Sequence, residues 1–406
     1  LVNETEKATV HGLYDTDFVN YSIVQGDYVI LSHPALFNDS EGNNPVFDYA
    51  AYRAQTGYNP VIVDINRLYD QFAYGVQGHP MAIKNFAAFI HTNWQSTPPE
   101  HVFIIGKGRI YKDIRNTTAS DNLVPTFGYP ASDNLLLAPI ASDVPVLPVG
   151  RLAATTGDQV SDYLNKIMTL ETAAKDSISL EAQSWRKQTL HLGGGANSWE
   201  HNILKNHLIN MQPIMENGSF GAEVHSFFKE QDEHVTVPNS QRINNLINEG
   251  VSMITFFGHG STKGFDFYLD APERYRNKDK YPLVMALGCY NGTIYDGEKL
   301  ISERFIFEQQ AGAIGYLGFV NAVTISAASN ISASFYDLIN DDMYGAGMGE
   351  VLKRTLEDFT ASASYSYNPV FQMGAQYLVY HGDPALKLNY RTTADFHIDE
   401  TTISTY

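Results

Sequence analysis

The chain has 406 residues, which is longer than one average domain of roughly 100 to 200 residues and predicts two or three domains. Its 45 acidic residues outnumber its 27 Lys and Arg residues, so the formal net charge is −18. Because phosphate backbones and anionic lipids are bound by clustered Lys and Arg, this balance argues against nucleic acid or an anionic membrane as the main partner. The single cysteine, Cys289, excludes an internal disulfide.

The sequence also argues against a segment that crosses or enters a membrane. No stretch reaches the roughly 18 uninterrupted apolar residues of a membrane-spanning helix, and the first residues lack the pattern of a signal peptide. We therefore expect a soluble protein. The chain opens with LVNETEKATV and has no initial Met, so we expect it to be a fragment of a larger, processed protein.

Short apolar runs alternate with amphipathic segments in the first half of the chain. Strands are predicted at 27–34, 59–65 and 101–108, and helices at 47–57 and 79–94. This alternation is typical of parallel strands joined by right-handed crossovers, and it indicates an α/β fold with a parallel sheet. Residues 111–148 contain several prolines and are predicted to be loop-rich.

A long predicted helix at 156–176 leads into a second half with the same alternation. Strands are predicted at 188–192, directly before His259, directly before Cys289 and at 312–320, and helices at 199–212, 240–250 and 299–310. Between the predicted helix at 199–212 and about residue 238, the sequence is polar. We expect two subdomains, 1–175 and 176–391, and the start of a following β module at 392–406.

His259 and Cys289 are the strongest candidates for chemistry. Each follows an apolar run and is preceded by a glycine, in FFGHG and ALGCYNG. Ligands bind beyond the carboxyl ends of parallel strands, so neighbouring strands would bring the imidazole and the thiol side by side. A neutral His can take the proton of a thiol and leave the nucleophilic thiolate. The amides of Gly260 and Cys289 could stabilise an oxyanion. The pattern is that of a cysteine peptidase.

Simpler interpretations remain open for each of these residues. A lone thiol is usually a small buried apolar group, and a lone His in a loop is usually only polar. The segment GGGANS, at 193–198, raises a nucleotide-binding alternative, but it lacks the third Gly of the dinucleotide fingerprint and the Lys of a P-loop. The segments FGYPASDN and YNGTIYDGEK could hold a structural calcium ion, although such loops are usually turns.

Several segments together resemble the gingipain family of cysteine peptidases, family C25. They are LYDQFAYGVQGHPMAIKNF, VFIIGKG, PVGRLAATTGDQVSDYLNKI, FFGHGSTKGF, YPLVMALGCYNG and YLVYHGDPALKL, in the order of the family. The resemblance extends over about residues 25–390 and is greatest to the gingipain-like sortase components of the type IX secretion system of Bacteroidetes. It implies a caspase-like α/β fold in two subdomains, of which the second, 176–391, carries the catalytic site.

The resemblance also implies roles for individual residues. Cys289 matches the nucleophile, His259 matches the catalytic His, and the amides of Gly260 and Cys289 match the oxyanion donors. Phe265, with Ser261 beside it, falls where the family has a wall of the substrate pocket. The family's acidic residue that orients the His matches Ala196 here, so we consider Asn197 or Glu200 as substitutes. No cofactor or metal ion is implied for the reaction.

The implied function is that of a cysteine endopeptidase or a sortase-type transpeptidase. Such an enzyme removes a C-terminal secretion signal from cargo proteins and transfers the new carboxyl end to a lipopolysaccharide amine. Its partners are then the cargo and other secretion-system components, and its location is the cell surface at the outer membrane. Because Ala196 stands in place of the acid, a catalytically weak or inactive scaffold of the secretion machinery is the alternative hypothesis.

Overall fold

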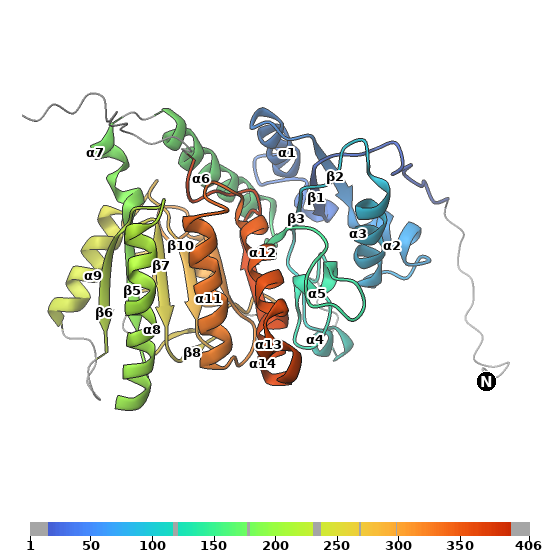
Figure 1. The fold of residues 1–406 in the computed structure, drawn as a ribbon. Helices are drawn as coiled ribbons and strands as arrows, with labels where there is room; N and C mark the ends of the chain where they lie inside the picture. Colours follow the sequence, from blue (N-terminus) through green and yellow to red (C-terminus); the bar gives the residue numbers. More distant parts are fainter. Residues whose placement is uncertain are drawn as a thin grey trace, which may run out of the picture.

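The computed structural model describes residues 15–116, 121–176, 179–229, 237–267, 269–297 and 299–390. One sheet of ten strands runs through the described molecule, in the order β2-β1-β3-β4-β12-β11-β10-β7-β5-β6 (Figure 1). The ten strands are β1 (Tyr28–Ser32), β2 (Pro60–Asp64), β3 (His101–Ile105), β4 (Val149–Leu152), β5 (Gln188–Gly193), β6 (Glu223–Phe228), β7 (Met253–Phe257), β10 (Leu283–Leu287), β11 (Gly315–Phe319) and β12 (Leu378–His381). Two further strands, β8 (Gly260–Ser261) and β9 (Gly264–Phe265), form a separate hairpin.

Neighbouring strands of the large sheet are parallel, except that β12 is antiparallel to β11. The predicted α/β class with a parallel sheet is therefore confirmed, with one antiparallel pair that the sequence pattern did not indicate. The four strands before residue 175 form one half of the sheet, and the later strands form the other half. The halves meet where β12 lies beside β4, through the pair His381 and Arg151.

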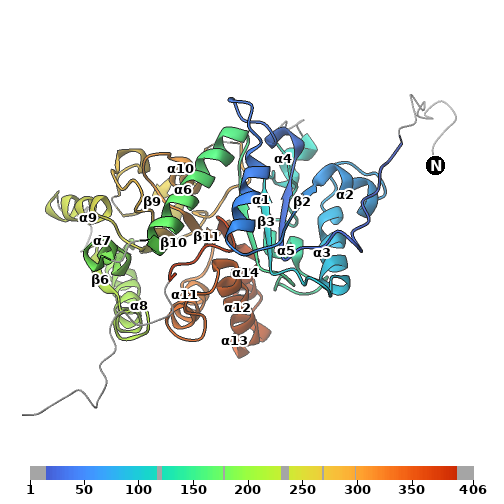
Figure 2. The same ribbon diagram turned by 90° about the horizontal axis from the view of Figure 1, so that it is seen from above.

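Helices cover both faces of the sheet (Figure 2). On one face α6 (Gly157–Asp176) contacts both α1 (Pro45–Gln55) and α10 (Ile301–Phe307). On the other face α11 (Ile325–Asn340) packs between α8 (Ser198–Asn217) and α12 (Met348–Ala361). The remaining helical segments are η2 (Pro34–Leu36), α2 (Ile65–Phe72), α3 (Met81–Asn93), α4 (Tyr111–Asn116), α5 (Asp133–Leu137), α7 (Leu180–Gln183), η3 (Ser184–Lys187), α9 (Val237–Glu249), η4 (Pro272–Arg274), α13 (Ala363–Tyr367) and α14 (Pro369–Tyr377).

Strand β1 illustrates how the pattern of apolar residues builds two core layers. Tyr28 and Ile30 point into the large core with α1 and α6, whereas Val29 and Leu31 point into a second core with α2 and α3. Successive side chains of a strand alternate between the faces, so a strand covered on both faces has to be apolar throughout. This requirement explains why the apolar runs of the sequence located most of the strands.

The structure differs from the sequence prediction in several regions, and strands β4 and β12 are among the elements that were not predicted. The polar region before residue 238 contains the edge strand β6, whose side chains are only partly buried and so do not form an apolar run. The loop-rich region 111–148 contains the short helices α4 and α5. Residues 321–377 form α11, α12, α13 and α14, for which the pattern gave no prediction. The predicted β module at 392–406 lies outside the described residues, and the boundary at 175 remains a prediction.

A buried cluster of charges and phenols joins the two halves of the chain. Asp383, in the loop after β12, accepts hydrogen bonds from Tyr28, Tyr49 and Arg53. Arg53 also binds Glu171 of α6, with an Nη1 to Oε1 distance of 3.0 Å. We call Asp383, Arg53, Glu171, Tyr28 and Tyr49 the Asp383 cluster. The cluster gives a structural role to Asp383 of the YHGDP segment, which is part of the family resemblance.

None of the helices in the described part of the chain combines the length and apolar character that a bilayer-spanning segment needs.

Candidate active site

His259 and Cys289 lie at the carboxyl ends of two paired strands. Strands β7 and β10 are adjacent and parallel, and Phe257 of β7 is in register with Leu287 of β10. His259 and Cys289 each follow that pair of residues by two positions. The equal offset brings the imidazole and the thiol to the same edge of the sheet, as the sequence analysis expected. This edge lies next to β8, at the bottom of the sheet in Figure 1.

The two residues line one small pocket of about 90 Å³. Cys289 is partly exposed, and its Sγ lies 3.8 Å from the carbonyl oxygen of Val323. The other lining residues come from α8, from the ends of β7 and β10, and from the start of α11. They are Glu200, Leu204, Phe257, Gly258, Leu287, Val323, Thr324, Ile325 and Ala328. The sequence analysis found the thiol and the imidazole but none of the contribution from residues 323–328.

Glu200 is the carboxylate that contacts His259. Its Oε2 lies 2.9 Å from Nε2 of His259 and also accepts the N–H of Ala196 at 2.8 Å. The Ala196 N–H and, after it, the His259 imidazole hold the pKa of Glu200 below its usual range, so this carboxyl group is ionised at neutral pH. Of the two substitutes considered for the missing acid, Glu200 therefore has the geometry to orient His259.

Asn197 has a different role at the start of α8. Its Oδ1 accepts the N–H groups of Trp199 and Glu200, at 3.1 and 3.0 Å, and caps the helix. Because the cap fixes the first turn, Glu200 is directed towards His259 by the helix itself. The contact also influences the tautomer of the imidazole. An ionised carboxylate only accepts hydrogen bonds, so the contact favours the neutral tautomer with the proton on Nε2 of His259 and the free lone pair on Nδ1.

Asn291 connects the loop that carries Cys289 to the hairpin that follows His259. Its Nδ2 donates to the carbonyl oxygens of Ser261 and Gly264, at 2.8 and 3.0 Å, and the residue is fully buried. A Cβ atom at Gly260 would come within 2.0 Å of Asn291 Oδ1, and one at Gly288 within 2.3 Å. The glycines are therefore required for close packing of the two loops, and the sequence analysis did not identify Asn291 as a site residue.

The glycines of GGGANS have a structural reason as well. Asp266 lies between the loops that follow β5 and β7, and its Oδ2 accepts the N–H of Gly195 at 2.8 Å. A Cβ atom at Gly194 would lie 2.1 Å from Asp266 Oδ1, and one at Gly258 would lie 2.4 Å from it. Two amides of the loop are thus already bonded to carboxylates, Gly195 to Asp266 and Ala196 to Glu200. This arrangement disfavours the phosphate-binding alternative, because like charges repel.

Phe265 and Ser261 belong to the β8–β9 hairpin and do not line the small pocket. The ring of Phe265 packs on Phe256 with a centroid distance of 4.6 Å, and Phe265 is half-buried. Ser261 is exposed, and its Oγ accepts the N–H of Lys263. Their assignment to a substrate pocket remains a prediction that depends on how a bound peptide would follow the hairpin.

The segments considered for calcium have other contacts in the structure. Asp133 of FGYPASDN forms a buried ion pair with Arg151, at 2.7 Å, and Asn134 donates to the carbonyl oxygens of Ala375 and Leu378. Asn291 of YNGTIYDGEK makes the contacts given above. Within the described residues, no group of three or more His, Cys, Asp or Glu side chains is arranged to hold a metal ion.

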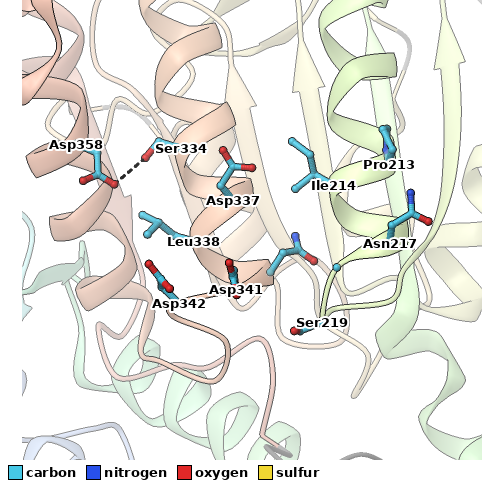
Figure 3. Close-up of a pocket in the computed structure, with 12 residues that line it drawn as sticks. Pro213, Ile214, Asn217, Ser219, Ser334, Asp337, Leu338, Asp341, Asp342 and Asp358 are labelled. Carbon is cyan, nitrogen blue, oxygen red and sulfur yellow. Dashed lines mark hydrogen bonds between the residues drawn. The ribbon is translucent and has the colours of Figure 1, made fainter.

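A larger pocket, of about 720 Å³, lies at the other ends of α8 and α11 (Figure 3). Its lining includes Pro213, Ile214, Asn217, Gly218 and Ser219 and four carboxylates, Asp337, Asp341, Asp342 and Asp358. At 1.5 Å per residue along α8, Glu200 and Asn217 are about 25 Å apart. The pocket contains no thiol or imidazole, so the smaller pocket at Cys289 is the candidate active site.

Comparisons with known proteins agree with this geometry. The model of peptidase family C25 matches residues 23–389. No curated protein matches the chain. Among solved structures, the Arg specific cysteine proteinase gingipain R (RgpB) has a TM-score of 0.69 and 13% identity, over 89% of this chain and 78% of that chain. The complex of the RgpB pro- and mature domains from Porphyromonas gingivalis gives 0.68 and 14%, over 88% and 79%.

Dimeric latent PorU from Porphyromonas gingivalis matches 91% of this chain and 30% of that chain, with a TM-score of 0.42 and 11% identity, a similarity that supports no conclusion. The match to gingipain R confirms the predicted caspase-like α/β fold. The family model covers nearly all of the chain, from before β1 to after β12. The chain belongs to peptidase family C25.

Proposed function

We propose that the protein is a cysteine endopeptidase or transpeptidase in which Cys289 is the nucleophile and His259 is first the base and then the acid. One observation carries this proposal. Cys289 and His259 each lie two residues beyond the ends of two paired strands, and they line one pocket. The carboxylate of Glu200 lies 2.9 Å from Nε2 of His259. This is the arrangement of nucleophile, base and orienting group that covalent acyl transfer requires.

The residues then act in the following order. Nδ1 of His259 takes the proton of Cys289, and the thiolate attacks the carbonyl carbon of a peptide bond. A C–S bond forms, and the negative charge on the carbonyl oxygen is stabilised by the N–H groups of Gly260 and Cys289. Each such donor contributes about 10² to 10³ in rate. When the C–N bond breaks, the leaving amine takes the proton from His259. The acyl-enzyme is then attacked by water in a peptidase or by an amine in a transpeptidase.

Glu200 takes the place of the acidic residue that the resemblance led us to expect at position 196. It keeps the proton of His259 on Nε2, which leaves Nδ1 free to act as the base. The hypothesis of an inactive scaffold rested on Ala196 alone. The Glu200 contact supplies a carboxylate for the orienting role, and it supports an active enzyme over the scaffold.

The biological role is proposed from the family resemblance. We infer that the enzyme acts at the cell surface, on the outer side of the outer membrane, as a sortase-like component of the type IX secretion system. Its substrate would be cargo protein with a C-terminal secretion signal, and lipopolysaccharide would supply the amine. Other components of the secretion system would be its partners. The reaction described above needs no cofactor, because both proton transfers use His259.

Intact mass spectrometry of a candidate cargo protein tests the proposal. The cargo is incubated with the wild type or with Cys289→Ala, in the presence and absence of an amine acceptor. Loss of the C-terminal signal with wild type alone would support a peptidase, and an added acceptor mass would support a transpeptidase. Equal cargo masses with both proteins, together with slow alkylation of Cys289 by iodoacetamide near pH 7, would contradict the proposal and favour the scaffold.

A further inference from the structure

The pocket beside Cys289 is lined mostly by apolar side chains, with Glu200, His259 and Thr324 as its polar members. Phe257 and Leu287 form its floor at the ends of β7 and β10, and both are buried. Its walls are Leu204 of α8, Val323 in the loop before α11, and Ile325 and Ala328 in the first turn of α11. We propose that this pocket receives the P1 side chain, the residue whose carbonyl group Cys289 attacks, and that it selects a small or medium-sized aliphatic residue. This inference rests on the proposed function and names its substrate class.

The position of the pocket assigns it to P1. The attacked carbonyl carbon comes within bonding distance of Cys289 Sγ, and the P1 side chain branches from the next atom of the substrate chain. It therefore extends only a few bonds from the thiol. The pocket is lined by Cys289 and His259 together with the buried side chains of Phe257 and Leu287. A side chain attached next to the reacting carbon can fill it without displacing either group.

The pocket disfavours a basic P1 residue, because the single carboxylate among its described lining residues already binds His259. The carboxylate of Glu200 is already bonded to His259 and to the Ala196 N–H. Thr324 accepts the N–H of Ala327 at 3.2 Å as the cap of α11. Behind the floor, the ring of His207 lies edge-on against Phe257 at 5.2 Å, and burial lowers its pKa to about 4, so it is neutral at pH 7. Both contacts of the Glu200 carboxylate use Oε2, so an Arg or Lys side chain would lose its hydration and could gain only Oε1 of a carboxylate that already binds His259.

The size of the pocket limits P1 as well. Its volume of about 90 Å³ is smaller than the roughly 150 Å³ of an apolar cavity that holds benzene. An aliphatic side chain such as that of Ala, Val or Leu fits this space better than an aromatic ring or a long chain. One methylene more or less in an apolar pocket changes the specificity constant by about tenfold or more. We therefore expect Val or Leu to exceed Gly by roughly 100-fold.

A set of peptide acyloxymethyl ketones that differ only at P1 tests the inference. The residues at P1 are Gly, Ala, Val, Leu, Phe, Arg and Lys, and the rate of the mass adduct on Cys289 is measured for each. We expect Ala, Val and Leu to react fastest, with Arg and Lys roughly 100-fold slower. Faster reaction of Arg or Lys, or equal rates for all seven, would overturn the inference and leave the catalytic role of Cys289 intact. If no peptide probe reacts, the proposed function fails and this inference fails with it.

Two variants of the pocket walls sharpen the test. Ile325→Ala enlarges the pocket and should raise the rate of the Phe probe relative to the Val probe by about tenfold. Val323→Asp adds a carboxylate and should raise the rate of the Arg probe relative to the Val probe by a similar factor. Val370→Ala, an exposed valine on α14, is the matched control and should leave the ranking unchanged. An unchanged ranking in both wall variants would overturn the assignment of this pocket to P1.

Discussion

The Asp383 cluster and the candidate active site are both built around a carboxylate, but their exposure differs. Asp383 is fully buried, whereas 57% of the His259 side chain beside Glu200 is exposed. Asp383 accepts hydrogen bonds from Tyr28, Tyr49, Arg53 and the N–H of Ala385, so its oxygens are saturated. The imidazole of His259, in contrast, keeps one nitrogen for chemistry. A saturated buried cluster stabilises the fold, and a partly unsatisfied exposed one can act on a substrate.

The pKa of each carboxylate reflects this difference. Burial raises the pKa of Asp383. The charge of Arg53 and the hydrogen bonds from Tyr49 and Tyr28 together lower it by more, so the pKa lies below its usual range. The pKa of Glu200 is lowered mainly by the Ala196 amide, with little effect of burial. Changes in the Asp383 cluster should therefore affect the free energy of unfolding. Changes around Glu200 should affect the rate.

The largest expected effect is on stability. Asp383→Ala leaves the guanidinium of Arg53 buried with Glu171 as its remaining carboxylate partner, and we expect a loss of about 3 to 5 kcal/mol in the free energy of unfolding. Urea denaturation measures it. The control is Glu357→Ala, which removes a partly exposed i,i+4 pair with Lys353 and should cost about 0.5 kcal/mol. A loss below about 1 kcal/mol for Asp383→Ala would contradict the role assigned to the cluster.

Acid should weaken the fold in two successive pH ranges. Burial lowers the pKa of His191 to about 4 from 6.5, so between these values the unfolded chain binds the proton and the native chain does not. Stability therefore falls as the pH drops from about 6.5 to 4, by roughly 3 kcal/mol for this residue. Because the pKa of Asp383 is lowered from 3.8, its contribution is lost only at more acidic pH.

Urea midpoints measured from pH 7 to pH 4 check the first range. In His191→Gln the free energy of unfolding should fall less between pH 6.5 and pH 4 than in the wild type, because the contribution of His191 is absent. The same dependence in both proteins would show that His191 is not kept neutral in the native state.

Glu200→Gln should lower the rate with which Cys289 reacts with a peptide probe, by about 100-fold. The reason is that an amide no longer selects the tautomer with the proton on Nε2 of His259. The free energy of unfolding should change little, since the side chain is partly exposed. Glu216→Gln, further along α8, is the matched control. If Cys289 reacts with the probe at the wild-type rate in Glu200→Gln, Glu200 does not orient His259.

Asn291→Ala should have the smallest effect, a fall in kcat of about tenfold with a loss of about 1 to 3 kcal/mol in stability. It removes the two hydrogen bonds that hold the β8–β9 hairpin against the Cys289 loop, and with them the position of the Gly260 amide. Kinetics well below the melting temperature separate the two effects. Asn330→Ala, whose amide binds Ser326 on the surface of α11, should change neither. An unchanged kcat would limit Asn291 to a structural role.

The sequence predicted most of the sheet because buried strands need continuous apolar runs. Strands β1, β2, β3, β5, β7, β10 and β11 lie within the predicted ranges or within a residue or two of them. Strand β6 escaped prediction because an edge strand with partly buried side chains has no such run. Strand β12 escaped because its antiparallel position beside β11 depends on a long connection through α11, α12 and α14.

The sequence by itself identified the two groups that we propose as the reacting groups of the candidate site. Local patterns identified strand ends at His259 and Cys289, and parallel strands carry their carboxyl ends to one edge. Only the tertiary structure decided which group orients the imidazole and what surrounds the thiol. Glu200 reaches His259 because Asn197 fixes the first turn of α8, and the apolar walls come from helices packed over the sheet. Contacts of this kind join residues far apart in the chain, so their spacing in the sequence carries no signal of them.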